Sequence, residues 1–194
     1  MSWISVDIEA DGPIPGFGIP PMAKPLWGYS MIAVGACLVA KPEIGFLGYL
    51  KPISEQWVPE ALAVSGFTRE EALEFPDPRT TMAAFNRWIH ECAEPPYIFV
   101  ADNNGFDFAW INWYFHQFGE GNPFGFSSKN INSLYQGMVG DVFASFKYLR
   151  RTKHDHNPMH DAQGNAEALL QMKAGVPRDP KDPRSDIVSL NAKF

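Results

Sequence analysis

The spacing of hydrophobic and polar positions predicts strands in the first quarter of the chain. Residues 3–9 predict a strand, because from Ile4 onward apolar and polar side chains alternate, which is the period of a half-buried strand. Residues 29–40 form an apolar run without helical periodicity, and residues 45–50 form a short apolar segment. With the first strand they predict a three-stranded β-meander. Residues 10–27 are rich in proline and glycine and are predicted to be a loop.

Helical patterns occupy most of the remaining chain. A buried strand is expected at residues 97–101, and the last helix has Asn157 as its N-cap, Pro158 at its first position and Gly175 at its end. The other predicted helices cover residues 59–64, residues 68–74, a segment capped at Thr80 or Thr81 and running to Cys92, residues 106–118, and one or two helices within residues 133–150.

This order of elements predicts an α/β fold with a mixed central β-sheet flanked by helices. The chain has 194 residues, of which 45% are hydrophobic, so it is long enough for one hydrophobic core. We expect one domain over residues 1–175 and a C-terminal tail over residues 176–194.

The sequence has no marks of membrane insertion or secretion. Its longest charge-free apolar run, residues 26–40, is shorter than the roughly 18 residues that a membrane span needs. The first residues lack the basic region and cleavage site of a secretory signal. The two cysteines, Cys37 and Cys92, are expected to be reduced thiols. We therefore expect a cytoplasmic protein with no membrane partner.

The formal net charge of −6 argues against a protein that coats nucleic acid nonspecifically. It does not exclude an enzyme that handles nucleic acid locally, because a carboxylate site loaded with divalent cations loses much of its negative charge. Composition alone leaves that choice open.

Two carboxylates share one face of the first predicted strand. Asp7 and Glu9 are two residues apart and point the same way, whereas Ile4, Val6 and Ile8 share the opposite face. Adjacent carboxylates inside a sheet repel each other unless cations lie between them. The pair is therefore a candidate metal site, although a solvated acidic face explains it equally well on its own.

Two further acidic residues open predicted helices. Asp107 follows the strand at 97–101, at the kind of strand end where α/β proteins usually bind ligands. Taken alone, a helix-capping turn is the simpler interpretation of that motif. Asp161 lies one turn into the last helix, and His156 precedes the N-cap of that helix, so the imidazole and the carboxylate can reach one spot.

The three histidines of this segment also suggest a zinc site. His154, His156 and His160 lie within seven residues, but an H-x-H-x-D-H metallohydrolase motif would need other residues at Pro158 and Met159. A zinc hydrolase is therefore a third hypothesis. We expect the first and last of these histidines to be ordinary surface residues.

In combination, these motifs resemble those of the DEDDh 3′–5′ exonucleases, which include DnaQ-like proofreading subunits, ribonuclease T and oligoribonuclease. The matching features are D-x-E in the first strand, F-D at the start of a mid-chain helix and H-x-x-x-x-D at the start of the last helix. The resemblance covers residues 5–175, and the stretch 59–68 resembles the segment before the H-G-I-T turn of the family. It implies a ribonuclease H-like fold and metal-dependent removal of nucleotides from a 3′ end.

By this resemblance, Asp7, Glu9, Asp107 and Asp161 match the four acidic metal ligands, and His156 matches the general base. Hard oxygen ligands and a phosphodiester substrate suit two divalent cations, Mg²⁺ or Mn²⁺. A neutral imidazole, with an ordinary pKa of about 6.5, can take a proton from the attacking water at neutral pH.

Residues outside these motifs are candidates for binding the nucleic-acid strand. Basic residues before the catalytic histidine suit the phosphate backbone, and aromatic residues suit stacking on terminal bases. A solvated helix end and a hydrophobic core are the alternative explanations for them. The candidate substrate-binding residues are Phe17, Trp27, Phe67, Asn103, Arg150, Arg151 and Lys153.

Aromatic residues surround more of the segment 106–118 than one apolar stripe requires. A helix buried between the sheet and another element is the simplest interpretation. A homodimer interface, as in several relatives of the family, is the interpretation we favour.

The leading hypothesis is a 3′–5′ exonuclease acting on single-stranded 3′ ends or short oligonucleotides, RNA or DNA, and releasing nucleoside 5′-monophosphates by a two-metal mechanism. The alternative is a catalytically silent nucleic-acid-binding or partner-binding module of the same fold. The intact five-residue set argues against that alternative, because a silent module does not need His156.

Overall fold

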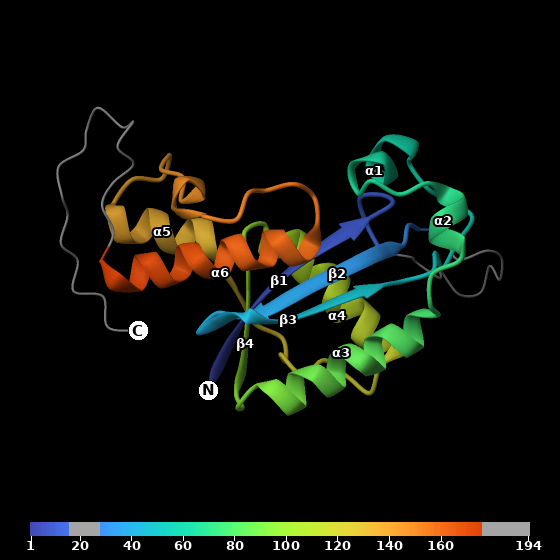
Figure 1. Ribbon diagram of the computed structural model, residues 1–194, viewed down its shortest axis with the longest axis horizontal. Helices are drawn as coiled ribbons and strands as arrows, with labels where there is room; N and C mark the ends of the chain where they lie inside the picture. The colour runs from blue at the N-terminus through green and yellow to red at the C-terminus, as the bar shows by residue number, and fades with distance from the viewer. Residues whose placement is uncertain (16–27, 176–194) are drawn as a thin grey trace.

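The computed structural model describes residues 1–15 and 28–175. Two predicted stacking residues, Phe17 and Trp27, and the predicted tail at 176–194 lie outside the described residues. A five-stranded sheet with the strand order β3-β2-β1-β4-β5 forms the centre (Figure 1). Its strands are β1 (Ser2–Ala10), β2 (Met31–Leu38), β3 (Lys41–Tyr49), β4 (Tyr97–Ala101) and β5 (Ser128–Asn130).

The sheet is mixed, as the sequence predicts. Strands β1, β2 and β3 form an antiparallel meander, and β4 and β5 add to β1 in parallel. Every residue of β2 is buried, which explains its continuous apolar run. Strand β5 is missing from the sequence-based prediction, because its three residues are polar and carry no strand pattern.

The helices agree with the prediction in position and differ at several ends. Helix α3 begins three residues before Thr81, because the Asp77 side chain accepts a hydrogen bond from the Arg79 N–H and Pro78 occupies the first position. The segment 133–150 contains one α-helix and one 3₁₀ turn. The helices are α1 (Pro59–Val64), α2 (Arg69–Leu73), α3 (Pro78–Cys92), α4 (Asn104–Phe118), α5 (Ile131–Val139), the 3₁₀ helix η1 (Lys147–Leu149) and α6 (Pro158–Ala174).

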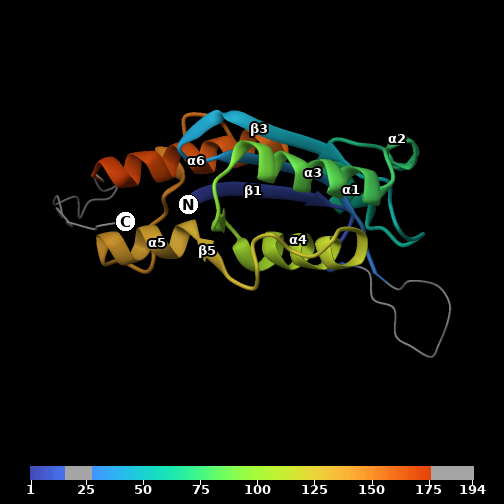
Figure 2. The ribbon, with the colours of Figure 1, turned by 90° about the horizontal axis from the view of Figure 1, so that it is seen from below.

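Helices cover both faces of the sheet (Figure 2). The main hydrophobic core lies between the sheet and helices α3 and α4, where Phe85, Trp110 and Tyr114 are fully buried. The outer aromatic residues of α4, such as Phe108 and Trp113, are partly buried against this core. Core packing thus accounts for much of the aromatic content of α4, and the homodimer stays a prediction.

Helix α6 covers the other face and approaches β2 closely. A Cβ atom on Gly35 would lie 2.1 Å from the carbonyl carbon of Pro158, so a larger residue there would push the start of the helix away. Because Gly35 pairs with Asp7 in the sheet, this close contact sets the first turn of α6 beside Asp7.

A buried ion pair fastens the end of β1 to the following segment. The Arg69 guanidinium lies 2.8 Å from the Asp11 carboxylate, which also accepts the Ser30 N–H at 2.5 Å. Arg69 donates a second hydrogen bond to the Ser54 carbonyl. These bonds hold α2 against the start of β2. Within residues 1–15 and 28–175, no helix combines the length and hydrophobicity needed to cross a membrane.

Candidate active site

Three carboxylates from distant parts of the chain meet on the α6 side of the sheet. Asp7 and Glu9 come from β1 and Asp161 from the first turn of α6, and one oxygen of each lies within 4.8 Å of one oxygen of the others. The alternation of β1 and the close approach at Gly35 together create this cluster.

Asp107 joins the cluster from α4, along the edge of β1. Strand β1 pairs with β4 only from Ser2 to Ser5, so beyond that point its edge is open. The Asp107 carboxylate accepts the Ile8 N–H there at 3.2 Å and is buried. The structure therefore brings all four acidic residues of the predicted set to one end of β1.

Burial and mutual repulsion raise the pKa values of these acids. Loss of hydration raises the pKa of Asp7 well above its ordinary value, and the nearby Asp107, Asp161 and Glu9 raise it further. Loss of hydration, with Asp161 and Asp107 adding to it, raises the pKa of Glu9 to about 8. Burial raises the pKa of Asp107 to about 7. At neutral pH the site cannot hold its full negative charge without added cations.

Asp161 shows most clearly that the site fits a cation. Its side chain is 1% exposed, and neither carboxylate oxygen accepts a hydrogen bond from the described part of the chain, although the Nδ1 atom of the exposed His154 lies 2.7 Å from Oδ1. The Arg150 guanidinium lies 4.0 Å from Oδ1, beyond hydrogen-bonding distance. A buried carboxylate that accepts no hydrogen bond is costly, whereas one that coordinates a divalent ion is satisfied. Oxygen ligands of this kind suit Mg²⁺ or Mn²⁺.

His156 lies at the exposed mouth of the cluster. It adopts a left-handed backbone conformation with a φ of 61°, and its Nδ1 atom lies 3.9 Å from a Glu9 oxygen. Asn157, as predicted, caps α6 by accepting hydrogen bonds from the Met159 and His160 N–H groups. The imidazole is thus held between a helix cap and the carboxylates, with nearly half its surface open to solvent.

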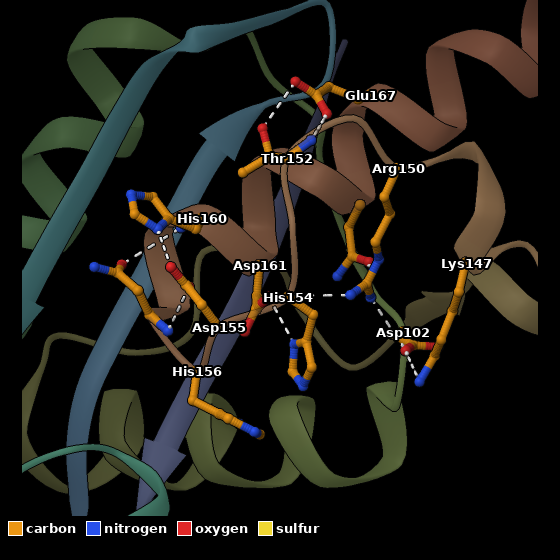
Figure 3. Close-up of polar contacts among 12 residues, drawn as sticks. Asp102, Lys147, Arg150, Thr152, His154, Asp155, His156, His160, Asp161 and Glu167 are labelled. Atoms are coloured by element: carbon orange, nitrogen blue, oxygen red, sulfur yellow. Dashed lines mark hydrogen bonds and ion pairs between the residues drawn. The ribbon is translucent and has the colours of Figure 1, made fainter.

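His154 departs from the sequence-based expectation. It is exposed, as an ordinary surface histidine would be, but its Nδ1 atom lies 2.7 Å from Oδ1 of Asp161 (Figure 3). The rings of His154 and His156 are adjacent, with centroids 4.3 Å apart. His160 instead pairs with Asp155 at 2.8 Å. The signal in the sequence was the two-residue spacing of the first two histidines, which lets an irregular turn bring both rings together.

Arg150 is buried beneath the site. Its side chain is 7% exposed and donates hydrogen bonds to Asp102 at 3.2 Å and to Asn165 at 2.5 Å (Figure 3). Gly164 leaves room for it, because a Cβ there would lie 3.3 Å from Cδ of Arg150, and it would also meet the Thr152 carbonyl at 2.8 Å. Arg150 is therefore an internal cation that must give up its partners before it can reach a phosphate.

The other candidate substrate-binding residues have different surroundings. Arg151 and Lys153 are exposed beside the histidine turn, and Asn103 is exposed at the start of α4. Phe67 is half-buried and packs edge-on against Tyr49 and Phe75. The two basic residues remain open to a strand, whereas Phe67 already has aromatic neighbours.

An apolar pocket lies away from these acids. It is at the opposite end of the molecule, where the start of β1 and the end of α6 meet, and it has a volume of about 270 Å³. Its lining includes Trp3, Leu134 and Leu169 but no acidic side chain. The carboxylate cluster and its candidate metal ligands therefore lie apart from this pocket.

The sheet order and the flanking helices define a ribonuclease H-like fold. No family model matches the chain. A curated relative, the 3′–5′ DNA exonuclease Cap18 of Escherichia coli, is 36% identical over 178 residues, which cover 85% of this chain and 88% of the relative. The chain belongs to the DEDDh 3′–5′ exonuclease superfamily and is a 3′–5′ exonuclease.

Solved structures of low sequence identity share the fold. The nuclease domain of 3′hExo, a DEDDh family member bound to rAMP, has a TM-score of 0.67 at 16% identity over 89% of this chain and 92% of its own. A zinc-bound complex of Escherichia coli exonuclease I with single-stranded DNA has a TM-score of 0.65 at 14% identity, over 94% of this chain and 41% of that one. A 3′-exonuclease recognising a histone mRNA stem-loop has a TM-score of 0.66 at 14% identity, over 100% of this chain and 71% of that one. Divalent-metal dependence goes with this family.

Proposed function

We propose that this exonuclease removes nucleoside 5′-monophosphates from the 3′ end of single-stranded DNA, using two Mg²⁺ or Mn²⁺ ions held by Asp7, Glu9, Asp107 and Asp161. The observation that supports this most directly is the buried Asp161 carboxylate, which has acids around it and accepts no hydrogen bond from the described residues, even though the exposed His154 imidazole lies 2.7 Å from it. Such a group favours a cation over an empty pocket.

Each of the four acids has a proposed role as a ligand of one or both ions. By the family resemblance, Asp7, which lies among the other three acids, would be a ligand of both ions, and Glu9 and Asp161 would hold the ion that activates the attacking water. Asp107, which accepts the Ile8 N–H, would hold the ion that stabilises the leaving group. Ions bound there would stabilise the attacking and leaving oxygens of an in-line displacement.

His156 acts as the general base. Its imidazole faces Glu9 and is open to solvent, so it can accept a proton from the attacking water and release it to bulk water. The rate gain expected from such a base is about 10²–10⁴-fold.

The strand approaches over the exposed basic residues. Arg151 and Lys153 precede the histidine turn and contact backbone phosphates, which fixes the strand without reading its sequence. The 36% identical relative is named as a DNA exonuclease, and this favours DNA over RNA as the substrate.

One assay tests the whole proposal. Linear DNA and RNA oligomers of one sequence, labelled at either end, and a circular single strand of DNA are incubated with the protein and Mg²⁺, Mn²⁺ or EDTA, and the products are resolved by length. We expect stepwise shortening from the 3′ end of linear DNA, slower attack on RNA, and no reaction with circles or in EDTA. Cleavage of circles at a similar rate, or hydrolysis in excess EDTA, would contradict the mechanism. Faster digestion of RNA would reverse the substrate assignment alone.

A further inference from the structure

Asp161 belongs to two clusters of metal-binding side chains. One consists of oxygen ligands only, from Asp7, Glu9 and Asp161. The other consists of His154, His156 and Asp161, whose ligand atoms also all lie within 4.8 Å of one another. Ligands of one tetrahedral zinc ion lie about 3.4 Å apart, so small rotations of the two exposed imidazoles would complete such a site.

The donor atoms of the second cluster select a different class of metal. Two imidazole nitrogens and one carboxylate oxygen suit Zn²⁺ and similar transition-metal ions, whereas Mg²⁺ prefers oxygen ligands and retains several waters. The Asp161 carboxylate is buried, accepts no hydrogen bond from the described segments and points toward this spot. His154 Nδ1 already lies 2.7 Å from it.

The turn that carries the two histidines is fastened on both sides. Glu167 of α6 accepts hydrogen bonds from the Thr152 N–H and hydroxyl before the turn, and Asn157 caps α6 after it. Asp155 points away from the cluster, because its oxygens bind the Asn157 N–H and His160 (Figure 3). The turn thus places His154 and His156 beside Asp161, whereas its own acidic residue, Asp155, lies outside the cluster.

We propose that His154, His156 and Asp161 form a second metal site, selective for Zn²⁺ or a similar transition-metal ion, whose occupation inhibits the exonuclease. The inhibition rests on the proposed role of His156. A metal ion bound to the imidazole takes the lone pair that would accept the proton of the attacking water. His154 has no part in the chemistry and serves only to complete the inhibitory site.

Zinc titration at saturating Mg²⁺ tests this, with single-turnover cleavage of a DNA oligomer as the readout. Each rate is normalised to the zinc-free rate of the same variant. For His154→Ala we expect the Zn²⁺ concentration for half-inhibition to rise by at least about tenfold, the loss typical of damage to a metal site. His160→Ala is the matched control, because His160 is similarly exposed but binds Asp155, and it should be inhibited like the wild type. Equal zinc sensitivity of wild type and His154→Ala would overturn the proposal.

A second measurement does not need catalysis. Nitrogen-15 correlation spectra of the histidine rings, recorded on the substrate-free protein with Mg²⁺, should show Zn²⁺ shifting the resonances of His154 and His156 but not those of His160. A protein that degrades DNA with Mg²⁺ but shows no response of these two rings would refute the zinc site and leave the proposed function intact. A protein whose rings respond but which has no Mg²⁺-supported activity would refute the proposed function instead.

Discussion

Acidic side chains at two places along β1 and its extension have opposite kinds of neighbour. Asp7, Glu9 and Asp11 follow one another at two-residue spacing. The Asp11 carboxylate, which is fully buried, has the Arg69 guanidinium and the Ser30 N–H as partners. The Asp7 and Glu9 carboxylates have Asp107 and Asp161 as neighbours, which repel them.

Burial raises the pKa at both places, so burial alone does not distinguish a structural acid from a catalytic one. At Asp11, the hydrogen bonds from Ser30 and the charge of Arg69 lower the pKa against the effect of burial. At Asp7, the nearby acids add to that effect. The partners of a buried acid therefore indicate its role, since an acid without donors needs an ion that the chain does not supply.

The largest effects on activity and stability are expected from neutralising one acid at each of the two places. Asp7→Asn should lower single-turnover cleavage by at least about 10³-fold, equivalent to roughly 4 kcal/mol of transition-state stabilisation. The same change should raise the melting temperature of the metal-free protein, because it removes repulsion. Asp11→Asn is the control and should do the reverse, lowering stability by about 3 kcal/mol since Arg69 is left buried without its counter-ion. A metal-free Asp7→Asn variant less stable than the wild type would show that the cluster is not under repulsion.

Replacing the candidate base should have the next largest effect. His156→Ala should lower the single-turnover rate at saturating metal by about 10²–10⁴-fold, while oligonucleotide binding persists because the four acids remain. His154→Ala and His160→Ala should each cost less than about tenfold, or roughly 1.4 kcal/mol. The acidic limb of the pH–rate profile should also flatten in the His156 variant. An equal loss in either control would show that the base is wrongly assigned.

The sequence was sufficient for the elements and the acidic motifs because their signals are local. Alternation fixed the face of Asp7 and Glu9, and Asn157 with Pro158 fixed the start of α6. The side-chain partners of the site residues were not predictable from the sequence, because these contacts join segments that are distant in the chain. Gly35 carries no sign that a helix start lies against it, and only the packed structure shows that His154 reaches Asp161.

Arg150 illustrates the same limit. In the sequence it is one of several basic residues before His156, but in the structure it is buried against Asn165 of α6, which lies 15 positions further along the chain. Strand β5 was missed for a related reason, since its three polar residues are held by pairing with β4 rather than by their own pattern.

A smaller effect is expected from pH on the metal-free protein. The folded-state pKa values of Glu9, about 8, and Asp107, about 7, lie above the ordinary values of 4.5 and 3.8. The folded protein therefore binds more protons than the unfolded chain between these limits, and the free energy of unfolding should fall as the pH rises from about 4 to 8. Denaturant unfolding at a series of pH values in EDTA measures this slope.

Metal should reverse that loss. At pH 8, Mn²⁺ at about 100 times its dissociation constant should add about 2.7 kcal/mol, or raise the melting temperature by roughly 5–10 °C. The Asp7→Asn variant should show a shallower pH slope and a smaller shift with Mn²⁺. A metal-free protein that gains stability from pH 5 to pH 8 would contradict the assignment of these acids as a repelling cluster.

The smallest effects are expected for DNA binding by the basic residues that precede His156. They should distinguish the exposed Arg151 and Lys153 from the buried Arg150. Arg151→Ala and Lys153→Ala should each weaken binding of single-stranded DNA severalfold at low salt, and each should reduce the slope of log affinity against log salt by about 0.7, the value for one lost phosphate contact. Binding is measured by fluorescence anisotropy with catalytically inactive protein, so that the oligomer is not degraded during the measurement.

The Arg150→Met variant is the comparison for these two exposed residues. Because Arg150 is 7% exposed and paired with Asp102 and Asn165, its loss should lower stability and leave the salt slope unchanged. A reduced slope in Arg150→Met would mean that this guanidinium leaves its buried partners to bind the strand, and unchanged slopes in the other two variants would remove them from the path of the DNA.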